Sequence, residues 1–132
     1  MKKIFLMLMC AITMVGFSSC EKDDEVKDSK IIGIWDLVYE EDIKDGEIVD
    51  RYEYEEGEYY YEFKKDGTGS WVENDVNDVD DMERWSLDSE ILTVVFGEED
   101  VEIYTIIELT KDEMILEEED GDYTYREHYK KR

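Results

Sequence analysis

Apolar residues recur at alternate positions through most of the chain from Ile31 onward. A period of two is typical of a β-strand that buries one face. The clearest run is "DVEIYTIIEL", in which one face carries Val101, Ile103, Thr105, Ile107 and Leu109. A second run places Tyr59, Tyr61 and Phe63 on a shared face. This pattern predicts an all-β fold.

Turn-forming residues divide the alternating segments into about eight short strands. "KKDGTG" (64–69), for example, predicts a hairpin turn whose glycines supply a positive φ. We interpret "ENDVNDVDDM" (73–82) as a loop. The strands are predicted near 33–41, 47–55, 58–65, 69–74, 83–88, 91–96, 101–109 and 113–119, with a ninth candidate near 122–130.

The connections are only two to five residues long, so we expect neighbours along the chain to pair antiparallel. A meander of this kind closes into an up-and-down barrel, which removes exposed sheet edges. The chain contains no proline, which suits continuous strand ladders.

The first 19 residues read as a cleaved secretory signal peptide. Lys2 and Lys3 precede a mostly apolar stretch from Ile4 to Phe17, followed by two small serines. This stretch of about 14 residues is short of the ~20 that a membrane helix needs, so a permanent anchor is the less favoured alternative. We therefore expect a signal peptide at 1–19, an acidic tether at 20–30 and one barrel domain at 31–132.

Cys20 would be the only thiol of the mature chain, because Cys10 leaves with the signal, and no internal disulfide could form. "FSSC" (17–20) resembles the lipobox of bacterial lipoproteins. That resemblance implies a diacylglycerol on Cys20, cleavage just before it and acylation of the new amine. Two or more acyl chains make an anchor that hardly dissociates.

The residues after Cys20 resemble an export signal that combines lysine with acidic residues. In one group of Gram-negative bacteria, this signal sends lipoproteins to the outer face of the outer membrane. The alternative is that these residues form a solvated acidic tether and carry no export signal. The residues concerned are Glu21, Lys22, Asp23, Asp24 and Glu25.

The charge of the chain excludes one class of partner. The formal net charge is -24, and removal of residues 1–19 takes away two lysines and no acidic residue, which leaves -26. Nucleic-acid binding needs clustered positive charge and is therefore excluded. Anionic membrane surfaces would also repel the chain, so a lipid would have to hold it at a membrane.

"IIGIWDLVYEED" (31–42) contains Gly33-Ile34-Trp35, which resembles the Gly-X-Trp signature of lipocalins. "YEFKKDGTGSW" (61–71), "WSLDSEILTV" (85–94) and the pattern that runs from 104 to 132 look like the short lipocalin-like domains of lipoproteins in the same bacterial group. The resemblance implies that Trp35 plugs one end of the barrel beneath a basic side chain of the last strand. Arg126 is the first candidate for that side chain and Lys130 the second.

Two functions remain open. In the first, the barrel binds a small hydrophobic molecule, as lipocalins do; the alternative for the lining residues is that they fill the barrel as its core. The candidate lining residues are Tyr59, Tyr61, Phe63, Trp71 and Trp85. In the second, the domain is a non-enzymatic surface module whose acidic, tyrosine-rich exterior, including Tyr60, meets a basic protein or another envelope component.

We expect no enzymatic activity and no cofactor. His128 is the only histidine and is interpreted as an exposed strand residue. With Cys20 acylated, a zinc site of the Cys/His kind is excluded. A weak calcium candidate lies in the predicted acidic loop, but the spacing is not that of an EF-hand, and a solvated loop is the favoured interpretation. Its residues are Asp75, Asn77, Asp78, Asp80 and Asp81.

Overall fold

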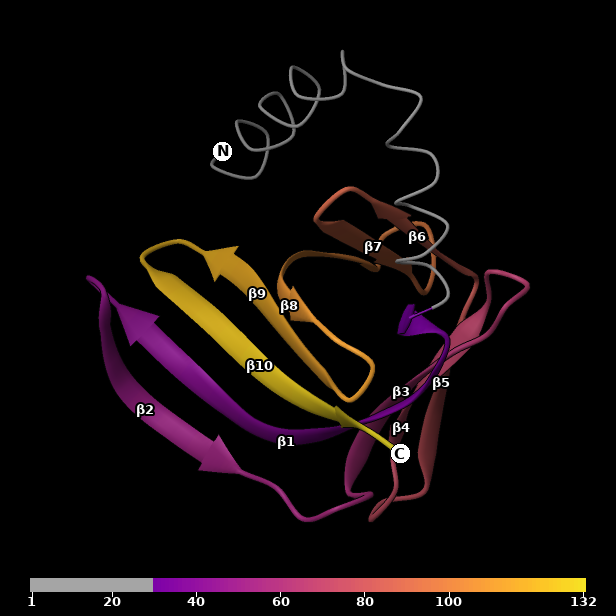
Figure 1. Cartoon of the computed structure of the whole chain (residues 1–132), viewed down its shortest axis with the longest axis horizontal. Helices are drawn as coiled ribbons and strands as arrows, with labels where there is room; N and C mark the ends of the chain where they lie inside the picture. Colours follow the sequence, from indigo (N-terminus) through magenta and orange to yellow (C-terminus); the bar gives the residue numbers. More distant parts are fainter. Residues whose placement is uncertain (1–29) are drawn as a thin grey trace.

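The computed structural model of the chain describes residues 30–132, which form ten antiparallel β-strands (Figure 1). The predicted signal peptide, Cys20 and the candidate export signal lie outside the described residues. Within residues 30–132, no helix is long and apolar enough to cross a membrane. The strands are β1 (Gly33–Lys44), β2 (Glu47–Glu53), β3 (Tyr59–Phe63), β4 (Gly69–Glu73), β5 (Asp78–Met82), β6 (Arg84–Asp88), β7 (Ile91–Val95), β8 (Val101–Leu109), β9 (Glu113–Asp120) and β10 (Tyr123–Lys131).

The strands belong to one sheet that curls into a nearly closed barrel. Its order is β5-β4-β3-β1-β10-β9-β8-β7-β6, and β2 pairs with β1 outside this path. The first and last strands are therefore neighbours, with ladder partners from Trp35↔Lys131 to Lys44↔Tyr123. The expected all-β antiparallel barrel is confirmed, with ten strands instead of about eight.

Pairing between neighbours along the chain fails at two places. β2 does not pair with β3, because both use the same edge of β1: Gly33–Asp36 pairs with β3, and Tyr39–Lys44 pairs with β2. A register shift between Leu37 and Tyr39 separates the two segments. An irregularity of this kind bends a strand and re-aims its edge. The second gap lies between β5 and β6, which occupy the two ends of the strand order.

The loop interpretation of residues 73–82 is wrong, because Asp78–Met82 forms β5. Its residues pair with β4 in regular register, from Glu73↔Asp78 to Gly69↔Met82. Asn77, at φ 60°, makes the turn that precedes it. Aspartate disfavours strands in general, but β5 has only one paired edge, and its four leading residues are exposed to water. Solvated carboxylates are tolerated, and even useful, on such an edge.

Trp35 is part of the packed core. Its side chain is fully buried, and its Nε1–H donates to the carbonyl of Ile31 over 2.8 Å. The Nζ atom of Lys131 lies 5.4 Å from the Trp35 ring centroid. Gly33 leaves room for this contact, because a Cβ there would come within 2.7 Å of the Lys131 side chain. Trp35 is thus covered by a basic side chain of the last strand.

The predicted identity of that basic residue is wrong. Arg126 pairs with Glu41 in the ladder and forms an ion pair with Glu117 at 2.6 Å. Directly paired residues share a face and successive residues alternate. Arg126 and Lys130 therefore face away from the Trp35 side of β10, whereas Lys131, opposite Trp35, shares its side.

We expect Trp35→Ala to lower the free energy of unfolding by about 3 to 5 kcal/mol, because it removes a fully buried indole and leaves a cavity. Urea unfolding followed by circular dichroism measures the change. Trp71→Ala, at a half-buried position on β4, is the matched control and should cost less. Wild-type stability in the Trp35 variant would contradict the structural role of this side chain.

Candidate functional site

The five rings predicted to line a cavity pack against one another. Tyr61 lies 4.7 Å from Trp71 and 5.2 Å from Phe63, measured between ring centroids. Phe63 in turn meets Trp85 edge-on at 5.6 Å, and Tyr59 stacks on Trp71 at 6.0 Å. Tyr61, Phe63 and Trp85 are buried, while Tyr59 and Trp71 are half-buried. The structure brings these rings together as packed core, which is the alternative interpretation of their role.

Two separate side-chain hydrogen bonds of tyrosine hydroxyls lie in this core, and one of them reaches the carboxylate of Glu127. The hydroxyls of Tyr61 and Tyr104 are 2.8 Å apart, and the Tyr129 hydroxyl donates to Glu127 Oε1 over 2.6 Å. Burial raises the pKa of all three tyrosines well above the ordinary value. Burial also raises the pKa of Glu127 to about 7, and Glu40 adds to the shift.

Glu127 was not predicted from the sequence, although a signal is present. The alternation of β10 places Tyr125, Glu127 and Tyr129 on one face. That face is the interior, because Tyr129 is buried opposite Leu37. A single acid between two inward tyrosines is therefore an interior residue, but the strand reads as polar throughout and hides this arrangement.

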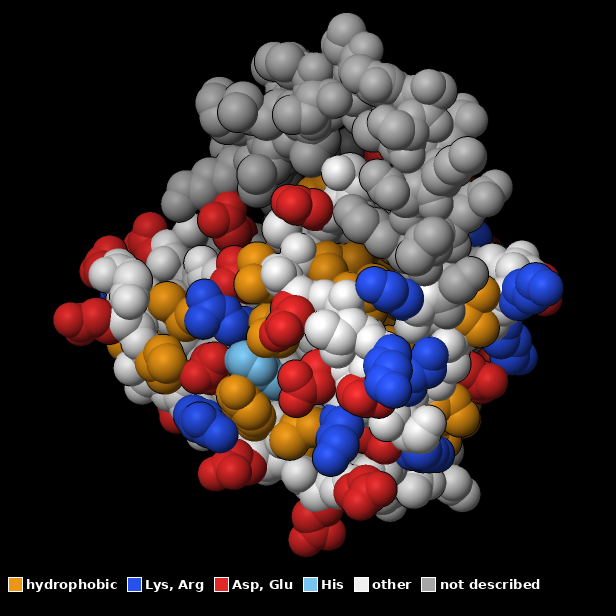
Figure 2. Space-filling view, in the orientation of Figure 1, with side chains coloured by type: hydrophobic (Ala, Val, Ile, Leu, Met, Phe, Trp, Pro, Cys, Tyr) orange, Lys and Arg blue, Asp and Glu red, His pale blue; other side chains and the backbone are white. Residues whose placement is uncertain are grey.

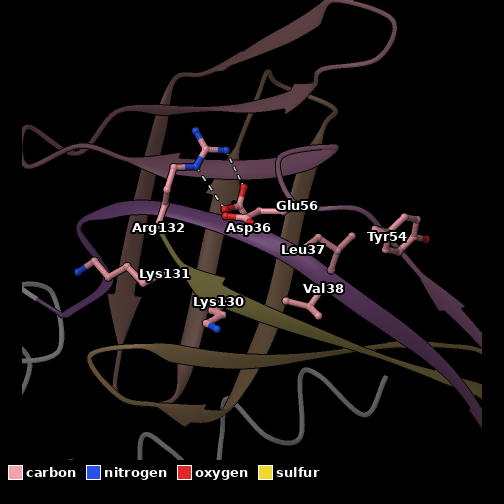
Figure 3. Close-up of a pocket in the computed structure, with 8 residues that line it drawn as sticks. All are labelled: Asp36, Leu37, Val38, Tyr54, Glu56, Lys130, Lys131 and Arg132. Carbon is pink, nitrogen blue, oxygen red and sulfur yellow. Dashed lines mark hydrogen bonds and ion pairs between the residues drawn. The ribbon is translucent and has the colours of Figure 1, made fainter.

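An open pocket of about 310 Å³ lies where β2 and β3 separate along β1 (Figure 3). We call it the fork pocket. Its walls come from β1, from the start of the β2–β3 connection and from the end of β10. The residues that line it are Asp36, Leu37, Val38, Tyr54, Glu56, Lys130, Lys131 and Arg132.

An ion pair fixes one wall of the fork pocket. Arg132 donates to Asp36 twice, from Nη2 to Oδ1 over 2.6 Å and from Nε to Oδ2 over 3.2 Å. These hydrogen bonds raise the pKa of Arg132. The guanidinium also lies 4.4 Å from the ring centroid of Tyr60. Figure 3 shows the two charged groups turned toward each other, with Lys131 directed away from them.

The rest of the pocket combines apolar and charged groups. Val38, at the β1 irregularity, supplies exposed apolar surface, whereas Leu37 beside it is almost fully buried. Lys130 supplies an exposed ammonium group and Glu56 an exposed carboxylate. Small-molecule sites commonly combine apolar walls with a few polar groups that set orientation. The pocket can therefore hold a small molecule that has an apolar part and a polar end.

A second polar cluster lies on the outer face of β1, β2 and β10. Tyr39 is sandwiched between the His128 ring, 3.9 Å away, and the Arg51 guanidinium, 4.0 Å away. His128 Nε2 lies 3.0 Å from Glu41 Oε1, and Glu41 is buried. The interpretation of His128 as an exposed strand residue is wrong, because only 18% of its side chain is accessible. Tyr39, His128, Arg51 and Glu41 each contact a neighbour in this cluster, so the cluster has a structural explanation.

The acidic residues at 75–81 do not converge on one point. Successive residues of β5 alternate between the two sides of the sheet, so Asp78 and Asp80 face opposite to Asp81. Among residues 30–132, no group of three or more His, Cys, Asp or Glu side chains is placed to hold a metal ion.

Comparisons with known proteins agree with this architecture. Residues 31–116 match the family model described as a lipocalin-like domain. The fold resembles the crystal structure of a lipocalin-like protein from Bacteroides uniformis, with a TM-score of 0.59 and 14% sequence identity, over 78% of this chain and 99% of that chain. None of the curated proteins compared with the chain matches it. At this identity, the structural likeness supports the fold alone.

We expect stability to fall as the pH rises from about 5 to 7. Between the ordinary pKa of 4.5 and the folded value of about 7, Glu127 keeps a proton in the folded protein that the unfolded chain has released. This group therefore stabilises the fold at low pH, by up to about 1.4 kcal/mol per pH unit in that range. Urea unfolding between pH 5 and 8 measures the slope.

Glu127→Gln should flatten the pH profile while keeping an acceptor for the Tyr129 hydroxyl. Glu98→Gln, at an exposed position, makes the same change in net charge and should leave the slope unchanged. Parallel profiles for the wild type and Glu127→Gln would contradict the assignment.

Proposed function

Because the chain belongs to the lipocalin-like domain family, we propose that it is a lipid-anchored envelope lipoprotein that binds a small molecule in the fork pocket. Lipocalin-like barrels are consistent with small-molecule binding. The observation that carries the choice of site is the pocket itself, an open volume of about 310 Å³ with apolar and charged walls. The ring-filled interior supports this choice, because its predicted lining residues contact one another.

The chemistry of the pocket indicates an amphiphilic ligand. Val38 offers exposed apolar surface, and the ammonium group of Lys130 takes no part in the Asp36–Arg132 ion pair. We therefore propose a small molecule with a hydrophobic part and a polar or anionic end. The proposed ligand class is therefore narrower than the hydrophobic molecule expected from the sequence. The proposed binding site lies on the outside of the barrel and not in its interior.

The proposed location rests on residues 1–25. The "FSSC" motif supports acylation of Cys20, and the Glu21–Glu25 segment supports export to the outer face of the outer membrane. The acyl chains would hold the domain at the membrane despite its negative charge. We propose no enzymatic role.

A second candidate function is an interaction module for a basic protein. The observation that favours it is strand β2, all seven residues of which are exposed. A strand that buries neither face contributes little to the core, which leaves its side chains available to a partner.

Filling the fork pocket should abolish ligand binding. Val38→Trp places an indole in the fork pocket, at the irregularity of β1. Val101→Trp makes the same change at a similarly exposed position of β8. The probe is 1-anilinonaphthalene-8-sulfonate, an aromatic anion, titrated into residues 30–132 and followed by fluorescence. We expect Val38→Trp to weaken binding by about tenfold or more and Val101→Trp to leave it unchanged, since only the first blocks the site. Unchanged binding in Val38→Trp would rule out the fork pocket.

Replacing Cys20 with Ser should release the protein from membranes, because serine cannot form the thioether that holds the lipid. Cys10→Ser, within the predicted signal peptide, is the matched control and should leave the protein in the membrane fraction. Sedimentation of cell lysates followed by immunoblotting measures the distribution. A Cys20→Ser protein that still pellets with membranes would contradict the anchor.

A further inference from the structure

Strand β2 has one paired edge and one free edge among residues 30–132. It pairs with Tyr39–Lys44 of β1, and the sheet order continues from β1 to β3 without it. In Figure 1, β2 lies at the outside of the molecule, on the far side of β1 from β10. A free edge presents unpaired backbone N–H and C=O groups to any strand that can reach them.

Both faces of β2 are open to water. Ile48, Val49 and Tyr52 are 56%, 54% and 45% exposed. Figure 2 shows acidic, basic and hydrophobic side chains next to one another on the side of the molecule where β2 lies. An added strand could therefore make side-chain contacts on both faces as well as backbone hydrogen bonds.

The direction of the backbone groups follows from one hydrogen bond. The Tyr54 N–H donates to the Val38 carbonyl of β1 over 2.9 Å. Backbone groups along a strand alternate between its two edges, so the amides of Arg51 and Glu53 point away from β1. The Arg51 amide donates instead to the side chain of Asp50, at 3.0 Å from Oδ1. A partner carbonyl could replace this exposed local contact.

The net negative charge of β2 favours a positively charged partner. Glu47, Asp50 and Glu53 outweigh the single cation, Arg51. Glu47 and Asp50 pair with Lys44 and Asp42 of β1, so the face that these four residues share carries more carboxylates than cations. Like charges placed opposite each other destabilise a strand pair. Antiparallel pairing with a second copy would oppose acidic strands in a chain of net charge -24.

We infer that the free edge of β2 takes up an extended basic segment of a partner protein as an added antiparallel or parallel strand. This inference rests on the second candidate function and names its surface and its partner class. Backbone hydrogen bonds to the amides of Arg51 and Glu53 hold the segment. Its Lys or Arg side chains lie on the face of Glu47 and Asp50, and its apolar side chains lie on the opposite face with Ile48.

The free edge of β5, at one end of the strand order, provides a matched comparison. It has only five residues, and it sits at the gap of the barrel, where the following strand, β6, bonds to the β3–β4 turn through Trp85 N–H and the Gly67 carbonyl. β5 carries the same kind of charge as β2 but lies beside this part of the barrel wall. A partner drawn by charge alone would bind β5 as well as β2.

The test uses the full chain in a neutral detergent and a synthetic octapeptide of alternating Lys and Val. Binding is measured by isothermal titration, and amide hydrogen exchange is followed by NMR. We expect the Arg51 and Glu53 amides to exchange about tenfold more slowly with peptide bound, because each gains a partner, while the Tyr52 amide stays as it is. A Glu-Val peptide of the same length should not bind.

Two double variants assign the site. Glu47→Lys with Asp50→Lys reverses the charge of β2, and Asp78→Lys with Asp80→Lys makes the same change on one face of β5. We expect the β2 variant to weaken peptide binding by about tenfold or more and the β5 variant by less than about threefold, since only the first removes facing charges. All four positions are exposed, and thermal melts confirm that both variants fold.

Four results would overturn the inference. Equal weakening by both double variants would show attraction to charge alone, and would leave the interaction function standing without β2. Protection of β5 amides would place the site on the other edge. Protection of Arg51 and Glu53 that grows with protein concentration, without peptide, would make the occupant a second copy. Failure of the Lys-Val peptide to bind at all would remove both the inference and the second candidate function.

Discussion

The pairing of the first strand with the last is the constraint on which the rest of the barrel depends. β1 is the strand that meets three others, because β10 occupies one edge while β3 and β2 divide the other. Its register with β10 sets Trp35 opposite Lys131, which places the indole inside and a cation over it. A slip of one residue would turn Trp35 to the outside. The burial of Trp35 in the core therefore helps to specify the register of β1 with β10.

A single irregularity in β1 produces both candidate binding surfaces. The register shift between Leu37 and Tyr39 is the point at which the edge of β1 passes from β3 to β2. The fork pocket opens there, and β2 leaves the barrel wall there. An evenly paired β1–β2–β3 meander would close the pocket and cover the free edge of β2. The irregularity of β1 that distinguishes this fold from an evenly paired barrel is thus also the place where the fork pocket and the edge of β2 become accessible.

Most of the strands could be predicted from the sequence, because turn-forming residues separate nine of the ten segments that form them. β5 was missed because four of its five residues are exposed and three are aspartates, so only its pairing with β4 defines it. The cation over Trp35 was assigned to Arg126 because register is a property of two strands and cannot be read from one. The fork pocket depends on the register shift between Leu37 and Tyr39 of β1, and no residue pattern in the sequence predicts this shift. The predicted lining rings were correctly placed inside, but their mutual packing is a three-dimensional property.

The interior and the outside of the barrel have different capacities for binding. Inside, the packed rings and the hydrogen-bonded tyrosine hydroxyls occupy the space between the strands, so a ligand there would have to displace packed rings. Outside, the fork pocket and the edge of β2 are already solvated, and a partner displaces only water and one local contact at Asp50. The two surfaces meet at the hydrogen bond between Tyr54 and Val38. Because both residues line the pocket and also end the β1–β2 ladder, a ligand that shifts this bond would also shift the edge offered by β2.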